Sequence, residues 1–193
     1  MKLSGTQVIP ASRQAVWKGL NDPQILQQCI PGCNKITTTS PTEMKATVTI
    51  AVGPVKANFS GQVTLSELKP PESYRISGKG EGGFAGFATG SAIVKLTPLG
   101  PNETQMDYDV DAQIGGKLAM LGSRLIDSTA TSLAEQFFTK FGKLMEKQGQ
   151  STPSSKSKAV AKKAISKKAA TKKIAKKPVS KKTKPPAQKF KKK

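Results

Sequence analysis

Two cysteines, Cys29 and Cys33, are the residues of this chain with the clearest potential for redox or metal chemistry, and they lie in the stretch CIPGC. A thiol–disulfide centre usually has two residues between its cysteines and a βαβ unit around them. The chain contains no histidine, which removes the commonest general base and metal ligand and leaves too few ligands for a zinc site. We therefore predict no metal site and no reactive thiol, and we expect both cysteines to pack at the end of a short helix.

The stretch GKGEGG at residues 78–83 matches the G-x-G-x-x-G pattern of dinucleotide-binding loops. That function requires a strand before the pattern and a helix after it, whereas strand-like residues lie on both sides here. We interpret these glycines as a place where a sheet bends or leaves room beside a ligand. Tyr74 and Tyr108 are candidates for hydrogen-bonding groups in a cavity, or for plain core. Because the chain shows no combination of residues typical of catalysis, we predict no catalytic residues and no enzyme.

Alternating apolar and polar residues predict the strands that would position these groups. The alternation is clearest in 43–52 and 104–114, and it predicts an antiparallel sheet with one face in water. Ser12 and the pair Asp22-Pro23 are typical helix starts and predict two short helices after the first strand. The first predicted strand is residues 2–9. About six strands follow the short helices, among them 43–52, 56–65, 74–82, 84–96 and 104–114.

Residues 117–147 form the predicted long helix, because their apolar residues recur at spacings of three and four. Together with the strands, this predicts an α+β fold in which a curved antiparallel sheet grips one long C-terminal helix. Gly122, Ser128, Thr129 and Ser132 fill little volume on the apolar side of this helix. A void between these residues and the glycine-rich strands would be an apolar ligand site.

Charge divides the chain into a domain and a tail. All twelve acids and fifteen of the 32 Lys and Arg residues precede residue 149, so residues 1–148 carry +3 and residues 149–193 carry +17. The second part consists mainly of Lys, Ala, Ser, Thr and Pro, which predicts a disordered tail. We see neither a signal peptide nor an apolar run long enough to span a membrane, and we expect a cytoplasmic protein with reduced thiols.

Three stretches carry a resemblance to a known family: IPASRQAVWKGLNDPQILQQCIPGC (9–33), GKGEGGFAGFATGSA (78–92) and GGKLAMLGSRLIDSTATSLAEQFF (115–138). Over residues 1–147 the chain resembles the CoxG family of carbon monoxide dehydrogenase subunits, within the START-like helix-grip superfamily. The resemblance implies a seven-stranded sheet around the helix and a hydrophobic cavity between them. It also implies an accessory factor that recruits a molybdenum-containing oxidoreductase, a molybdenum hydroxylase, to the cytoplasmic membrane.

We predict that such a cavity binds a quinone or another isoprenoid lipid, with no covalent cofactor. Two alternatives stay open for the domain. A START-like cyclase-type enzyme would need an acid–base pair in the cavity, and a pure docking protein would bind its partner without a ligand. Residues on the inward faces of the predicted elements are the candidates for the cavity lining. They are Trp17, Leu26, Ile30, Val48, Ile50, Phe59, Phe84, Tyr108, Leu121, Leu125 and Phe137.

We predict that the lysine pairs of residues 149–193 bind a polyanion. We favour the anionic inner face of the cell membrane, which would make the protein peripherally associated with it. Non-specific binding to nucleic acid is the alternative, and a tail that only solubilises or meets an acidic protein remains open beside both. The predicted contact residues are Lys162, Lys163, Lys167, Lys168, Lys172, Lys173, Lys176, Lys177, Lys181 and Lys182.

Overall fold

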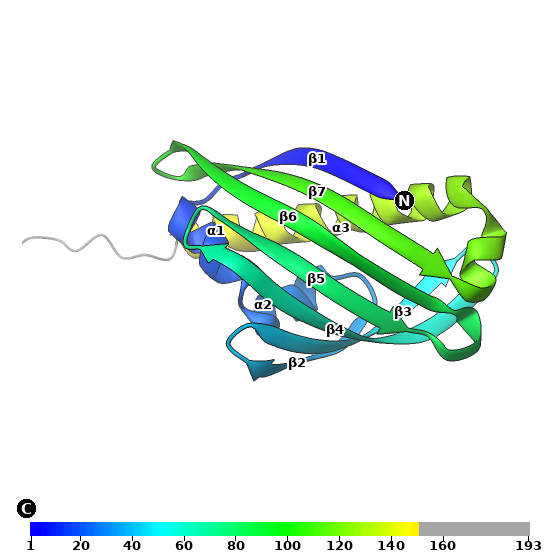
Figure 1. Ribbon diagram of the computed structural model, residues 1–193. Coiled ribbons are helices and arrows are strands. Elements are labelled where there is room, and N and C mark those ends of the chain that lie inside the picture. The colour runs from blue at the N-terminus through cyan, green and yellow to red at the C-terminus, as the bar shows by residue number, and fades with distance from the viewer. Residues whose placement is uncertain (151–193) are drawn as a thin grey trace, which may run out of the picture. The chain divides into compact units, whose positions relative to one another are not determined.

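The computed structural model describes residues 1–150, which form seven strands and five helical segments (Figure 1). The strands are β1 (Lys2–Ile9), β2 (Cys33–Ser40), β3 (Glu43–Val52), β4 (Val55–Lys69), β5 (Ser73–Glu81), β6 (Phe87–Gly100) and β7 (Glu103–Gly115). The helices are α1 (Arg13–Leu20), α2 (Pro23–Cys29) and α3 (Ser123–Gln150), with short 3₁₀ helices η1 (Gly83–Ala85) and η2 (Gly116–Leu121). The ten lysines predicted to bind polyanions lie outside the described residues.

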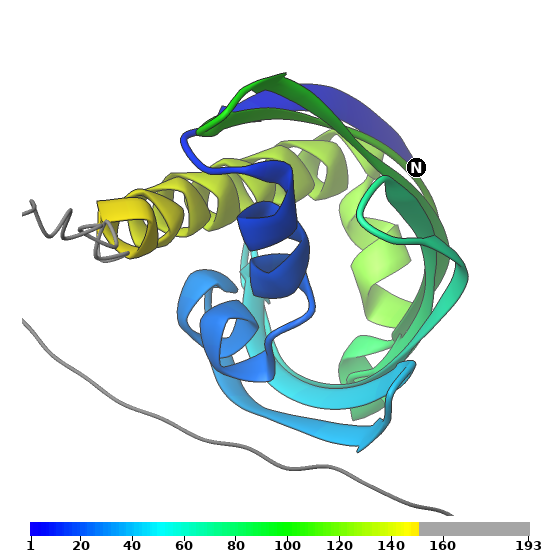
Figure 2. The ribbon, with the colours of Figure 1, turned by 90° about the vertical axis from the view of Figure 1, so that its left-hand side faces the viewer.

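All seven strands belong to one antiparallel sheet with the order β1-β7-β6-β5-β4-β3-β2. Strands β2 to β7 follow one another as hairpins, and β1 pairs with β7, so β1 and β2 are the two edges. The segment α1–α2 connects these edges, and Figure 2 shows the sheet curled around α3 with α1 and α2 between its two edges. The predicted helix-grip architecture is therefore confirmed.

The two short helices begin where their capping residues predict. The Ser12 hydroxyl accepts a hydrogen bond from the Ala15 backbone N–H at 3.4 Å and caps α1. The Asp22 carboxylate accepts one from the Gln24 N–H at 2.8 Å and caps α2, whose first residue is Pro23. Both helices then turn their apolar residues, among them Val16 and Ile25, into the core.

Two predicted boundaries were wrong because of glycines, and one strand was missed. The long helix does not run from 117, because Gly122 has φ 86° and separates the 3₁₀ helix η2 from α3. The strand expected from residue 84 starts at Phe87, because Gly83 and Gly86 also have positive φ and shape the turn η1. Strand β2 was not individually predicted, since Thr37–Thr39 interrupt any alternation.

The described core consists of two separate clusters of buried residues. One packs around Val16, Phe141 and Met145, where α1 and the end of α3 meet the sheet. The other contains Phe59 and Leu118, where η2 covers the sheet. Between the clusters the inward face of the sheet carries small residues, which leaves space against α3.

Candidate functional site

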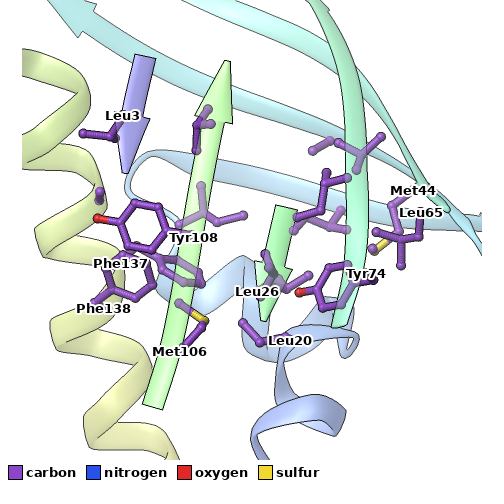
Figure 3. Close-up of a pocket in the computed structure, with 18 residues that line it drawn as sticks. Leu3, Leu20, Leu26, Met44, Leu65, Tyr74, Met106, Tyr108, Phe137 and Phe138 are labelled. Carbon is purple, nitrogen blue, oxygen red and sulfur yellow. The ribbon is translucent and has the colours of Figure 1, made fainter. Parts of the chain in front are cut away.

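A cavity of about 350 Å³ lies between the sheet and α3, within the size range of small-molecule sites (Figure 3). Apart from two tyrosine hydroxyls, its side chains are apolar. The lining residues are Leu3, Leu20, Leu26, Ile30, Ile36, Met44, Ala46, Val63, Leu65, Tyr74, Ile76, Val94, Met106, Tyr108, Val110, Ala134, Phe137 and Phe138.

Antiparallel register brings the lining residues of neighbouring strands together. Tyr74 of β5 and Tyr108 of β7 both pair with Val94 of β6, so the three side chains point to the same face of the sheet. The α3 residues Phe137 and Phe138 approach from the opposite side, and Figure 3 shows them next to Tyr108. The walls of the cavity are thus a row of inward strand residues, one side of α3, and Leu20, Leu26 and Ile30 from the α1–α2 segment.

The Tyr74 ring is 3% exposed and packs edge-on against Trp17, with 5.2 Å between ring centroids. Burial raises the pKa of Tyr74 well above its usual range, so its hydroxyl stays protonated. The Tyr108 ring stacks on Phe138 at 5.2 Å, and its hydroxyl lies over Gly5, where any Cβ would touch it.

No hydrogen bond joins either tyrosine hydroxyl to another group in residues 1–148. Each hydroxyl can donate a hydrogen bond, and both remain accessible, because no fully buried polar side-chain atom of the described residues lacks a partner. A polar group without a partner in an apolar cavity favours a ligand that supplies one. The site is therefore suited to a mostly apolar molecule that carries a hydrogen-bond acceptor, such as a carbonyl oxygen.

A second cavity, of about 140 Å³, lies at the η2 end of the sheet. Its lining residues are Met1, Ile50, Val52, Phe59, Ala88, Ile114, Leu118, Ile126, Thr129, Ala130 and Leu133. Like the larger cavity, it is bounded by the inward face of the sheet on one side and α3 on the other.

Glycines occupy the inward face of the sheet between the two cavities. Gly78 pairs with Gly90, and Gly80 pairs with Gly61. A Cβ added at Gly78 or Gly80 would meet only atoms of β4 within 4 Å, so α3 does not fill this space. A hollow over these glycines shares Val63, Ile76 and Val110 with the larger cavity and Ala88 with the smaller one. A hollow with several glycines and alanines in its lining thus lies between the two cavities.

The structure distributes the predicted lining residues over several environments. Leu26, Ile30, Tyr108 and Phe137 line the larger cavity. Ile50 and Phe59 line the smaller one. The other five line neither: Trp17, Val48, Phe84, Leu121 and Leu125.

Packing explains most of these differences. Trp17 packs against the larger core cluster, and Leu121 and Leu125 pack against the smaller one. Val48 points inward opposite Phe59 but borders neither cavity. Phe84 is 71% exposed, because it lies in the turn η1 rather than in a strand, and its assignment to the inward face was wrong.

Several lining residues escaped the sequence analysis, although the pattern contained their signal. Met106 and Val110 share the alternating face of Tyr108 in β7, and Tyr74 was considered without being included. Phe138 was missed because it directly follows Phe137 and falls outside the apolar stripe of the helix pattern.

The cysteines behave as packing residues. Cys29 is fully buried, Cys33 is partly buried at the start of β2, and both are free thiols. Burial raises the pKa of both thiols, which keeps them protonated and poorly nucleophilic. Within the described residues, no group of three or more His, Cys, Asp or Glu side chains could hold a metal ion.

A curved antiparallel sheet closed around a C-terminal helix, with an apolar cavity between them, defines a START-like helix-grip domain. A START superfamily protein from Mycobacterium smegmatis has this fold, with a TM-score of 0.60 and 14% sequence identity over 76% of this chain and 98% of that one. The chain belongs to the CoxG family of carbon monoxide dehydrogenase subunits, whose family model matches residues 5–145.

Two further comparisons extend this relationship. A conserved protein from Geobacillus kaustophilus is 32% identical, with a TM-score of 0.72 over 77% of this chain and 97% of that one. The persistence and stress-resistance toxin PasT from Escherichia coli O6:H1 is 25% identical over 139 residues, which are 70% of this chain and 84% of the toxin. No helix in residues 1–150 is long and apolar enough to cross a bilayer. Family and fold together indicate an accessory protein that binds a ligand.

Proposed function

We propose that the domain binds a quinone or a related isoprenoid lipid without a covalent bond, and that it serves a partner oxidoreductase at the membrane. The observation that carries the proposal is the apolar cavity of about 350 Å³ with two tyrosine hydroxyls that have no partner in the described chain. The partner that we propose is a molybdenum-containing enzyme of the carbon monoxide dehydrogenase type, and the family name supports this choice.

A quinone matches the chemistry of this cavity. Its ring is flat and apolar enough to pack between Phe137, Phe138 and the inward strand residues, and its carbonyl oxygens accept hydrogen bonds from Tyr74 and Tyr108. Burial of apolar surface supplies most of the affinity, at about 25 cal/mol per Å². The hollow over Gly78 and Gly80 offers room for an isoprenoid chain towards the smaller cavity.

The proposed task follows from solubility. A quinone is too apolar to leave the bilayer unaided, whereas a molybdenum hydroxylase is a soluble enzyme. A domain that encloses the quinone at the membrane surface brings the two together. The lysines of residues 162–182 are proposed to attach the protein to anionic lipid, and they lie outside the described residues.

The composition of the cavity supports a role without catalysis. Its lining contains no carboxylate, amine or thiol, and its only polar side-chain groups are two tyrosine hydroxyls. A cyclase-type reaction would need an acid and a base of different pKa within reach of the substrate. We therefore propose an accessory protein rather than an enzyme.

The experiment is extraction of the full chain, purified from its native host, followed by mass spectrometry of the extract. We expect a quinone or another isoprenoid lipid in near-stoichiometric amount. A chain that arrives empty and takes up no quinone or lipid from detergent overturns the ligand proposal. An empty chain that still captures the oxidoreductase would have a docking role only, and one that retains nucleic acid in high salt would point to the tail alternative.

A further inference from the structure

Three large apolar side chains project into solvent at one end of the domain, where η1 and η2 pack against each other. Phe84 is 71% exposed, Phe87 is 51% exposed and Met120 is 85% exposed. We call Phe84, Phe87 and Met120 the turn-end patch. Figure 1 shows that the β3–β4 and β5–β6 turns and the start of α3 all lie at this end.

Basic side chains surround the turn-end patch. The ammonium of Lys117 lies 5.2 Å from the centroid of the Phe84 ring, and Lys56 borders the same shallow hollow as Phe84. Arg124 follows η2 in the first turn of α3. In the part of the chain that the structure describes, none of these three cations forms an ion pair. Glu81 is the acidic residue nearest to the patch in sequence, at the end of β5.

The hairpins at the other end of the sheet carry more carboxylates than cations. They bear Glu43, Glu67, Glu72 and Glu103 beside Lys69, and the last turns of α3 near this end carry Lys140 and Lys143. Two of the carboxylates are already paired, Glu72 with Arg13 at 3.7 Å and Glu67 with Arg75 at 2.8 Å. An anionic surface would therefore meet three cations without an ion pair beside the patch, and a mixture of carboxylates and cations at the far end.

We propose that the η1–η2 end docks on a lipid bilayer with anionic headgroups. Phe84, Phe87 and Met120 enter the interfacial layer, while Lys56, Lys117 and Arg124 contact lipid phosphates. Aromatic side chains favour the bilayer interface, and apolar residues with basic neighbours are typical of surfaces that bind there. The three side chains project separately from two short turns. A fluid lipid interface accommodates such side chains more readily than a groove of fixed shape on a partner protein. This contact belongs to the folded domain and does not depend on a cavity ligand or on residues 151–193.

Docking in this orientation places η2 against the bilayer. Leu118 of η2 lines the smaller cavity and is buried, whereas Met120 of the same helix points outward. Gly116 and Gly122, with φ of 76° and 86°, bound this short helix on both sides. The helix that contributes Leu118 to the lining of the smaller cavity is thus the one that would touch the lipid.

The first test locates the contact in the full chain. Phe84→Trp places a reporter in the patch, and Leu99→Trp places one at a 51% exposed position at the far end of the sheet. Both variants keep Trp17 as a common background. Vesicles of phosphatidylcholine and phosphatidylglycerol with brominated acyl chains are added in high salt, which weakens attachment through the lysines of residues 162–182.

We expect the emission of the Phe84→Trp variant to shift to the blue and to be quenched by bromine, and that of the Leu99→Trp variant to stay unchanged. Equal quenching of both variants, or of neither, overturns the proposal.

The second test measures binding by vesicle co-sedimentation. The double variant Phe84→Ser/Met120→Ser removes most of the patch, and Val8→Ser/Leu99→Ser removes two exposed apolar residues elsewhere. We expect Phe84→Ser/Met120→Ser to bind the vesicles at least about tenfold more weakly than Val8→Ser/Leu99→Ser. Both variants lose exposed apolar surface, but only Phe84→Ser/Met120→Ser loses it from the turn-end patch. Equal partitioning contradicts the proposal. So does a patch variant whose only defect is lost self-association in solution, because the occupant would then be a second copy of the chain.

Discussion

Tyr74 and Tyr108 pair with the same residue, Val94, from opposite sides, so two phenol groups face one cavity across a single intervening strand. Adjacent strands are about 4.8 Å apart, which separates the two backbones by about 10 Å. That spacing lets two hydroxyls contact different ends of one ligand ring system. The pair is the most specific polar feature of an otherwise apolar cavity.

The first prediction concerns these hydroxyls. Because neither has a hydrogen-bond partner in the described chain, Tyr74→Phe and Tyr108→Phe should leave the melting temperature nearly unchanged. Each should weaken binding of a short-chain quinone about three- to tenfold, the value of one hydrogen bond. Thermal unfolding and a fluorescence titration measure the two effects. A lower melting temperature with unchanged affinity would show that the hydroxyls serve the fold instead.

The second prediction fills the larger cavity from α3. Ala134 lines it, so Ala134→Leu should reduce quinone affinity at least about tenfold and raise the free energy of unfolding by about 1 kcal/mol as the void fills. Thr131→Leu adds a leucine to an exposed position of the same helix and is the matched control. Equal affinities of the two variants would mean that the ligand binds elsewhere.

How far the sequence predicts this site depends on the element. In β7 the alternation is regular, so Tyr108 could be assigned to the inward face together with its neighbours Met106 and Val110, and all three line the cavity. Around Phe84 the alternation has no meaning, because Gly83 and Gly86 adopt positive φ and turn the chain before the strand begins.

Whether an inward side chain lines the cavity or packs in the core is harder to predict than its inward orientation. Trp17 and Leu125 do point inward, yet both pack into core clusters instead of facing the void. Whether an inward residue meets a neighbour or a cavity depends on residues distant in sequence, such as the register that sets Gly78 beside Gly90. The alternation in one sequence predicts the face of the sheet on which a residue lies, but it does not predict which residue of the next strand lies beside it.

The third prediction concerns the junction between β7 and the chain that leaves β1. The Thr104 hydroxyl is fully buried and donates a hydrogen bond to the Ala11 carbonyl at 2.8 Å. Thr104→Val leaves that carbonyl without this donor and should lower the free energy of unfolding by about 1–3 kcal/mol. Thr89→Val, on the exposed face of β6, should change it by less than about 0.5 kcal/mol. Urea unfolding measures both, and equal midpoints would contradict the assigned role.

The last prediction uses the two thiols as probes of the fold. Burial raises the pKa of Cys29 and Cys33, so each is more readily ionised in the unfolded chain than in the folded one. Their contribution to stability is therefore complete below the ordinary thiol pKa of about 8.5 and declines as pH rises above it.

At pH 8 iodoacetamide should modify Cys33, which is partly exposed, well before Cys29, which is fully buried. Mass spectrometry of the two peptides over time measures the difference, and Cys33→Ser removes the fast phase as the control. Addition of urea should bring both rates together, because unfolding exposes both thiols. Rapid modification of Cys29 in the folded chain would mean that α2 opens from the sheet, and it would place a mobile element beside Leu26 and Ile30 of the larger cavity.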